Sequence, residues 1–284
     1  MNFLFLRIAC AIAGTGVAAW QDARTSFIDD KITLGMIGVG ATLCFLDVFN
    51  AIQQKIDLTP WLWVALVALA IAALGFLAWR AGQFGGGDVL LFIGLHLLLP
   101  FNPRSFLPLP YPFIVSVLVA ASFFASVYSA LWYAKRLRDE RALEPRKNAL
   151  SIAALFLSLL VFALASFSLA QTLFFTALFA SAFFLSLYKH ELLSRVVVKR
   201  LRLSEVEDED VLAFDELPKR LTAKYSIGRV LSKNEIAKLR AIGRKEKIRF
   251  WPVYKELPRF APFVLLGLLA CLAVGDLVFF VLTY

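Results

Sequence analysis

Residues 149–188 read ALSIAALFLSLLVFALASFSLAQTLFFTALFASAFFLSLY, 40 consecutive positions without a charged side chain. About 20 apolar helical residues cross the roughly 30 Å hydrocarbon core of a bilayer, so this stretch is long enough to cross it twice. We predict two helices with a break near Ser166–Gln171, where the apolar run is thinnest. The stretch therefore predicts a protein that is solvated largely by lipid.

The composition of the whole chain agrees with this prediction. Hydrophobic residues make up 60% of the 284 positions, which is more apolar surface than a soluble domain of that length can bury. The formal net charge of +9 would suit a nucleic-acid partner in a soluble protein. Basic residues collect in the cytoplasmic loops of membrane proteins, however, so we expect a lipid bilayer and no nucleic acid as partner.

Eight apolar segments predict an all-α polytopic membrane protein with about eight transmembrane helices. They are residues 3–21, 32–49, 60–79, 88–100, 112–134, 149–167, 169–188 and 261–283. The first segment lacks a small-residue cleavage site, and a charged loop follows it, so we expect a mature helix rather than a signal peptide. The short span at 88–100 is expected to end at Pro100.

Four regions follow from these spans. Residues 1–134 form a membrane domain with two acidic motifs, 135–188 a basic loop with two further helices, 189–260 a polar segment, and 261–284 the final helix. In the polar segment, Ser232-Lys-Asn-Glu235 has the spacing of a helix capping box. We predict a small cytoplasmic α+β domain there, and the alternative is a basic tether beside anionic lipid.

The basic residues predict the orientation of the chain in the membrane. If the N-terminus lies outside, the cytoplasmic loops carry two, one, six and eighteen Lys or Arg residues, whereas the opposite face carries only Lys55 and Arg104. Those cytoplasmic loops are 22–31, 80–87, 135–148 and 189–260. We therefore expect a multi-pass protein of the cell (plasma) membrane in which the first two of these loops face the cytoplasm.

Asp22 and Asp88 stand out because this topology places both at the cytoplasmic face. Asp22 follows the first span, and Asp88 ends the string Gly85-Gly86-Gly87-Asp88 at the start of the fourth span. A helix N-terminus favours a carboxylate, so Asp88 could be a simple helix cap. A cap does not account for three glycines, which allow another backbone, such as an extended substrate, to approach closely.

A pair of neighbouring carboxyl groups predicts a metal-free peptide hydrolase. Two such groups cannot both ionise easily, so one stays protonated while the other activates a shared water. One takes a proton from the attacking water and the other donates a proton to the carbonyl oxygen, with the roles reversed as the bond breaks. The sequence leaves open which aspartate takes which role. Cys10, Cys44 and Cys271 lie in apolar stretches without metal-ligand spacing, and we expect no metal and no cofactor.

The two acidic motifs resemble those of the GxGD membrane aspartyl proteases, in particular the prepilin peptidases and their archaeal branch, the preflagellin (prearchaellin) peptidases. In that family an aspartate follows the first helix, then come a basic residue and an Ile/Val-Pro/Ser-Asn/Asp turn. The resemblance spans about the first 135 residues and implies that Asp22 and Asp88 are catalytic. The matching residues of the first motif are Asp22, Arg24 or Thr25, and Ile28-Asp29-Asp30, and those of the second are Gly85, Gly87 and Asp88, with Gly86 at its variable position.

This resemblance implies an endopeptidase that removes short basic leader peptides from membrane-inserted type IV pilin-like or archaellin precursors. A hydrophobic helix follows the leader in such precursors, so the scissile bond lies at the inner membrane interface. Asp29 stands where proline is usual in the family, and Leu90 where many members have lysine. We hypothesise that Asp29 and Asp30 attract the basic leader. Changing both to lysine should then raise the Michaelis constant, and unchanged kinetics would reject the idea.

Other interpretations make different demands on the sequence. A presenilin-like intramembrane protease would have a Tyr-Asp pair within a helix and a Pro-Ala-Leu string, and neither occurs. A transporter would line several spans with polar residues, whereas most spans here are Leu, Ala and Phe throughout. A secretion-system scaffold would explain the spans but not Gly85–Asp88. The oligomeric state stays open.

Three further ionisable residues lie in or beside the spans. Asp276 lies in the last span but nearer its outer end, so we do not expect it to join the acidic pair. His96 lies among leucines and is expected to be a hydrogen-bonded interior residue. Asp47 is expected to end the second span near the outer face.

Overall fold

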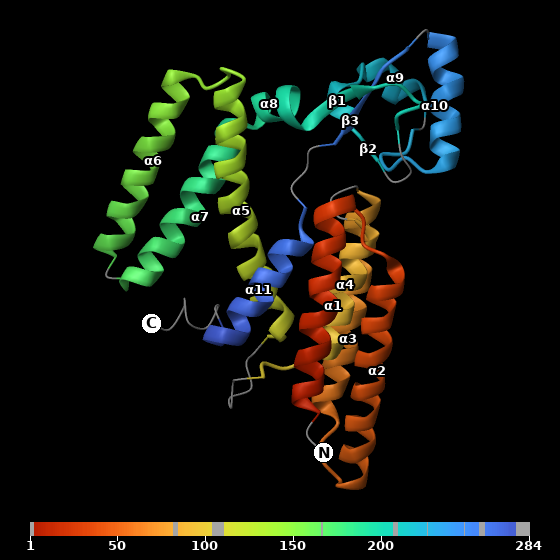
Figure 1. The fold of residues 1–284 in the computed structure, drawn as a ribbon, viewed down its shortest axis with the longest axis vertical. Helices are drawn as coiled ribbons and strands as arrows, with labels where there is room; N and C mark the ends of the chain where they lie inside the picture. Colours follow the sequence, from red (N-terminus) through yellow and green to blue (C-terminus); the bar gives the residue numbers. More distant parts are fainter. Residues whose placement is uncertain are drawn as a thin grey trace. The chain divides into compact units, whose positions relative to one another are not determined.

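The computed structural model of the chain divides into two compact units (Figure 1). The first consists of Met1–Trp79, Gln83–Ser126 and Arg259–Tyr284, and the second of Arg80–Gly82 and Val127–Pro258. The structure describes residues 3–81, 85–103, 111–165, 167–206, 210–225, 227–246, 248–255 and 259–276.

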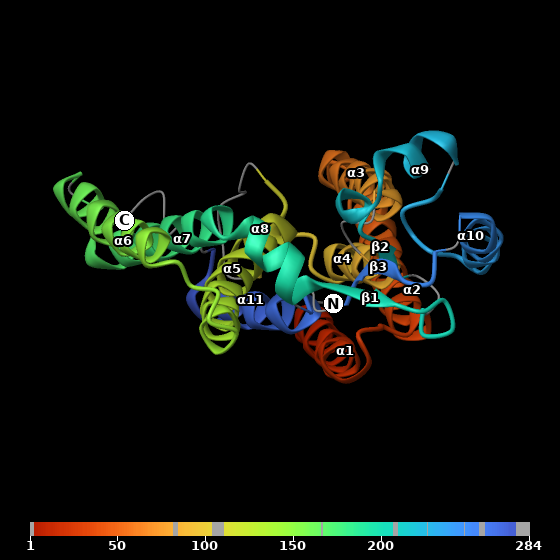
Figure 2. The same cartoon turned by 90° about the horizontal axis from the view of Figure 1, so that it is seen from above.

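The first unit is a helical bundle that contains both aspartates. Its helices are α1 (Leu4–Thr25), α2 (Asp30–Gln53), α3 (Thr59–Arg80), α4 (Gly86–Leu98), the first part of α5 (Phe113–Asp139) and α11 (Ala261–Val274). Helix α2 packs mainly against α4, and α1 packs against α11, α2 and α4. Figure 2 views this bundle from above, with α1 and α11 again side by side. Helix α4 is therefore enclosed by longer neighbours.

Close helix packing in this bundle depends on small residues. A Cβ atom added to Gly40 of α2 would lie 2.9 Å from the backbone of Leu97 and Leu98, so only glycine fits against the end of α4. Large apolar side chains point outward elsewhere, for example Leu62 and Leu69 of α3, which are 64% and 66% exposed. Lipid rather than water is the solvent that suits such a surface.

Six of the described helices are long and apolar enough to cross a membrane, namely α1, α2, α3, α5, α6 and α7. The other two predicted spans correspond to the shorter apolar helices α4 and α11, of 13 and 14 residues. The sequence predicted about eight spans, and helix length alone therefore supports six. Part of the predicted span 261–283 lies outside the described residues.

The second unit begins with a helical hairpin. Helices α6 (Pro145–Leu164) and α7 (Leu169–Leu187) pack against each other and separate at the predicted break. The Ser168 hydroxyl accepts a hydrogen bond from the Gln171 backbone N–H at 3.4 Å, and the Gln171 side chain accepts one from the Ser168 N–H at 2.9 Å. This reciprocal cap explains why the 40-residue apolar stretch forms two helices rather than one.

The polar segment of this unit is a small α+β module, as predicted. Its strands pair antiparallel in the order β1-β3-β2, with Val198 opposite Tyr254 and Leu212 opposite Val253. Trp251 and Leu239 are fully buried in its core. Its elements are α8 (Lys189–Glu191), the π-helical turn Leu192–Val197, β1 (Val198–Leu201), β2 (Val211–Leu212), the 3₁₀ turn Phe214–Glu216, α9 (Lys219–Lys224), α10 (Lys233–Glu246) and β3 (Trp251–Tyr254).

The predicted capping box of α10 is only half formed. The Ser232 hydroxyl accepts a hydrogen bond from the Glu235 N–H at 3.4 Å, as the spacing predicted. The Glu235 carboxylate instead accepts one from the Gly228 N–H at 2.9 Å. The acid therefore ties the helix to the preceding loop rather than closing its own cap.

Candidate active site

Asp22 lies in the last turn of α1 and is 7% exposed. Its Oδ2 atom accepts a hydrogen bond from the backbone N–H of Ala261, the first residue of α11, at 3.1 Å. Helix α1 then ends at Ser26, which adopts the left-handed conformation with φ 57°. The chain thus turns sharply just after the acid, and the N-terminus of a helix more than 200 residues later closes over it.

Asp88 lies at the N-terminus of α4, three residues after the cap residue Gly85. Its Oδ2 atom accepts a hydrogen bond from the Gly85 N–H at 3.3 Å, as a helix-capping acid does. Its Oδ1 atom is buried and has no hydrogen-bond partner among the residues that the structure describes. Helix capping therefore accounts for only one oxygen of this carboxyl group.

The two acids are brought together by the contact between their loops. A Cβ atom added to Gly87 would lie 2.9 Å from Cβ and 3.2 Å from the backbone oxygen of Ile28, in the loop after α1. The absence of a side chain at Gly87 thus allows the start of α4 to approach that loop. The negative charge of Asp22 acts electrostatically on Asp88. Burial and this like charge both oppose ionisation of the two groups together.

The other residues of the glycine string have more room. A Cβ atom added to Gly86 would make an ordinary contact with the Trp79 ring at 3.7 Å, and one added to the exposed Gly85 would lie 3.3 Å from Oδ2 of Asp88. Steric need for glycine is therefore concentrated at Gly87. Roles for Gly85 and Gly86 in binding a substrate backbone remain predictions.

Asp29 and Asp30 lie at the start of α2, next to the acidic pair in sequence. Asp29 is the N-cap residue, and its side chain accepts a hydrogen bond from the Lys31 N–H at 3.0 Å. Its own N–H donates to the Gln21 side chain at 3.0 Å, which fixes the turn. Asp30 is exposed in the first helical turn. The structure thus gives Asp29 a capping task, while leader binding by either residue remains a prediction.

The ionisable residues at the other end of the bundle have structural partners. The Arg7 guanidinium pairs with Asp47 at 2.6 Å and donates hydrogen bonds to the backbone oxygens of Leu97 and Leu98, each at 3.0 Å. Asp47 was predicted only to end the second span, but α2 continues to Gln53 and Asp47 takes part in a partly buried ion pair. This pair was not predicted from the sequence.

His96 and Asp276 are both buried and hydrogen-bonded. His96 is 1% exposed and its Nε2 atom lies 3.0 Å from the backbone oxygen of Val64, which confirms an interior hydrogen-bonded residue. Asp276 is 9% exposed and accepts hydrogen bonds from the hydroxyls of Tyr111 and Ser116, at 2.9 and 2.7 Å. These bonds tie the end of α11 to the start of α5.

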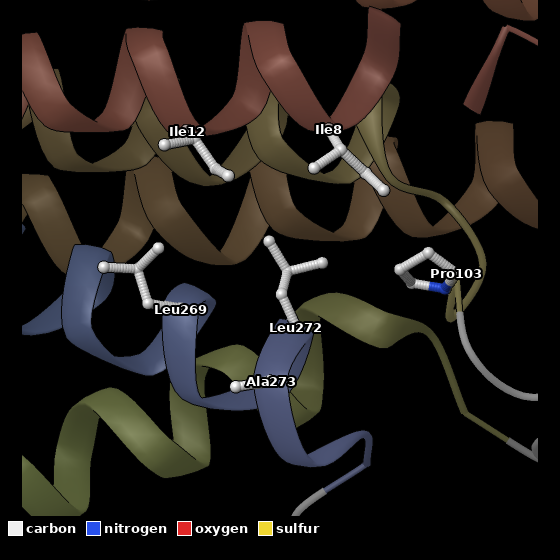
Figure 3. A pocket seen from close by; sticks show the side chains of 6 residues that line it. All are labelled: Ile8, Ile12, Pro103, Leu269, Leu272 and Ala273. Atoms are coloured by element: carbon white, nitrogen blue, oxygen red, sulfur yellow. The ribbon is translucent and has the colours of Figure 1, made fainter. Parts of the chain in front are cut away.

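An apolar hollow of about 480 Å³ lies between α1 and α11 (Figure 3). The side chains that line it point toward one another from the two helices and from Pro103, and none of them is polar or titratable. They are Ile8, Ile12, Pro103, Leu269, Leu272 and Ala273. On α1 they lie at least ten residues before Asp22, so the hollow is not part of the acidic site.

Comparison with known proteins gives a context for the acidic pair. Residues 9–130 match the model of the type IV leader peptidase family, and this segment includes α4 and both aspartates. This segment is therefore similar to that family over slightly less than half of the chain. The described residues contain no group of three or more His, Cys, Asp or Glu side chains that could hold a metal ion.

The chain has a curated relative among archaeal proteins. The chain is 31% identical over 117 residues to the protein named "Prepilin peptidase EppA" of Methanothermobacter thermautotrophicus. The match covers 39% of this chain and 29% of the relative's length. No solved structure matches the chain.

Part of the site lies outside the leader peptidase segment, and the sequence analysis missed it. Arg259 and Ala261 come from the start of α11, far beyond residue 130. The Arg259 side chain donates a hydrogen bond to the Ser26 hydroxyl at 3.1 Å, and its charge acts on Asp22. No local pattern could have revealed these contacts, because they depend on the packing of α11 against α1.

Proposed function

We propose that the chain is a membrane aspartyl endopeptidase that removes short basic leader peptides from type IV pilin-like or archaellin precursors at the cytoplasmic face. The observation that carries this proposal is the contact of Gly87 with Ile28, which brings the segments of Asp88 and Asp22 together within residues 9–130. The name of the archaeal relative supports the precursor class.

The chemistry needs one protonated and one ionised carboxyl group. The ionised group takes a proton from water as the water oxygen attacks the scissile carbonyl carbon. The protonated group gives its proton to the carbonyl oxygen. In the second half, the proton taken from water passes to the amide nitrogen while the C–N bond breaks. The hydroxyl of the tetrahedral intermediate returns a proton to the other acid. The pair therefore ends in its starting state, with no cofactor consumed.

The membrane arrangement belongs to the same proposal. The apolar helices in the described part of the chain cross the plasma membrane, and the shorter α4 and α11 begin near the interface, at Gly86 and Ala261. The turn that follows Asp22, the start of α4 and the α+β module then lie in the cytoplasm. A precursor inserted through its apolar helix presents its basic leader at the same depth.

Cleavage of a pilin-type precursor in proteoliposomes tests the proposal. The substrate has a short Lys/Arg-rich leader before an apolar helix, and mass spectrometry identifies the bond that is cut. We expect Asp22→Asn and Asp88→Asn each to lower the rate by about 10²-fold or more, because neither acid can replace the other in proton transfer.

Asp57→Asn is the matched control, because Asp57 is an exposed acid that caps the start of α3 through Thr59 and asparagine caps helices equally well. Its rate should equal that of the wild type. A wild-type chain that leaves such precursors intact would contradict the proposed substrate. An Asp22→Asn or Asp88→Asn variant with a near-normal rate would contradict the proposed chemistry.

A further inference from the structure

The start of α11 contacts both helices that carry the acidic pair. Ala261 donates its backbone N–H to Asp22 of α1 at 3.1 Å, and the hydrogen bond is buried. Phe260 stacks edge-on against Phe92 of α4, one turn after Asp88, with ring centroids 6.1 Å apart. Arg259 is hydrogen-bonded to Ser26, directly after α1. Three consecutive residues thus fix the position of α1 relative to α4 at the site.

The same three residues distinguish the two acids electrostatically. Burial opposes ionisation of Asp22, but the N–H bond from the N-terminus of α11 and the positive charge of Arg259 both favour its ionised carboxylate. Asp88 receives one N–H bond, from Gly85, and its buried Oδ1 atom has no partner among the described residues. A proton on that Oδ1 atom would be available to a substrate carbonyl.

We propose that Arg259, Phe260 and Ala261 are positioning residues of the aspartate pair, and that they hold Asp22 as its ionised member and leave Asp88 as the proton donor. This inference rests on the proposed peptidase function and adds to it the assignment of roles. The positioning residues lie beyond the leader peptidase segment 9–130. The last helix is therefore part of the active site.

The charged groups around Asp22 define the test. Arg259 before α11 and Asp88 on α4 act on the pair electrostatically. Arg24 lies in the same turn of α1 as Asp22 but stacks on the Trp20 ring, with its guanidinium carbon 4.6 Å from the ring centroid. Asp29, Asp30 and Lys31 lie at the start of α2, after the turn. Among these groups, Arg259 is the positive charge that acts directly on Asp22.

The experiment measures kcat/KM for precursor cleavage against pH, with the full-length chain in proteoliposomes. Asp22 must be ionised to take the proton from water, so activity falls on the acidic side as Asp22 becomes protonated. Arg259→Gln removes a charge that favours ionisation. We expect its acidic limb to move to higher pH by about one unit, with near-normal activity regained at alkaline pH.

Arg259→Lys keeps the charge and should retain the wild-type profile. Arg138→Gln removes an exposed charge from the last turn of α5 and is the matched control, with no shift expected. An Arg259→Gln profile that coincides with the wild type would overturn the assignment. A uniform loss of activity at every pH would also overturn it, because it would indicate a purely structural role. Loss of cleavage by the wild type would instead reject the proposed function itself.

Discussion

Gly87 shows how one missing side chain determines the geometry of the acidic site. The loop after α1 lies so close to the start of α4 that the Cβ atom of any other residue would meet Ile28 at 2.9 Å. Ile28 is itself 5% exposed and packed in the core, so it cannot move aside without disturbing its neighbours. The glycine and the isoleucine therefore belong to one packing unit, although 59 positions separate them.

Replacing Gly87 should consequently destabilise the protein. Gly87→Ala forces a methyl group against Ile28, and we expect a loss of about 1–3 kcal/mol. Gly86→Ala introduces the same residue one position earlier, where the nearest atom is 3.7 Å away, and should leave the melting temperature unchanged or higher. Thermal unfolding in detergent micelles measures both variants. Equal melting temperatures would show that the two glycines are not sterically different.

At the scale of elements, α4 is held at its C-terminal end by polar groups from two other helices. Its N-terminus carries Asp88, and its C-terminus ends before Pro100 with backbone oxygens that need donors. Arg7 of α1 supplies these donors to Leu97 and Leu98 and is held in turn by Asp47 of α2. These contacts thus fix the position of the short helix α4 along the axes of its neighbours α1 and α2.

This arrangement predicts unequal effects of removing the two partners. Arg7→Met leaves the half-buried Asp47 carboxylate without its cation and two helix-end carbonyls without donors, at a cost of about 1–3 kcal/mol. Asp47→Leu leaves Arg7 bonded to the carbonyls and should cost less. Melting temperatures in micelles rank the two variants. If Asp47→Leu proved the more harmful change, α4 would not depend on Arg7 in this way.

At the scale of the whole molecule, connections rich in basic residues alternate along the chain with connections that have few. The turn after α1, the connection from α3 to α4, the loop after α5 and the segment between α7 and α11 carry 27 of the 30 Lys and Arg residues, within 22–31, 80–87, 135–148 and 189–260. This distribution is typical of a chain whose basic loops stay in the cytoplasm.

Cysteine labelling tests this topology. Single cysteines from Thr25→Cys and Ala81→Cys, in a background without Cys10, Cys44 and Cys271, should be protected equally from an impermeant maleimide applied to intact cells. Lys55→Cys, in the connection between α2 and α3, should be labelled. Positions 25 and 81 on opposite faces would separate the two aspartates and exclude a shared water.

The sequence predicted this architecture wherever the signal is local. Apolar length predicted the helices, and the motif around Asp88 predicted the acid at a helix start. The Arg7–Asp47 pair was within reach, because two opposite charges inside neighbouring spans need partners. The contacts of Arg259 and Ala261 could not be predicted, because they depend on how α11 packs against a helix that it follows at a distance in sequence: Ala261 lies 239 positions after Asp22. The residues of α11 alone indicate only an apolar helix.

The contact between Ala261 and Asp22 also bears on when the site is completed during synthesis of the chain. Ribosomes make proteins from the N-terminus, so both acids enter the membrane long before α11 has been synthesised. Until that last helix inserts, the carboxylate of Asp22 lacks the N–H donor that holds it. A nascent chain that already carries both acids therefore lacks this contact until α11 has been made and inserted.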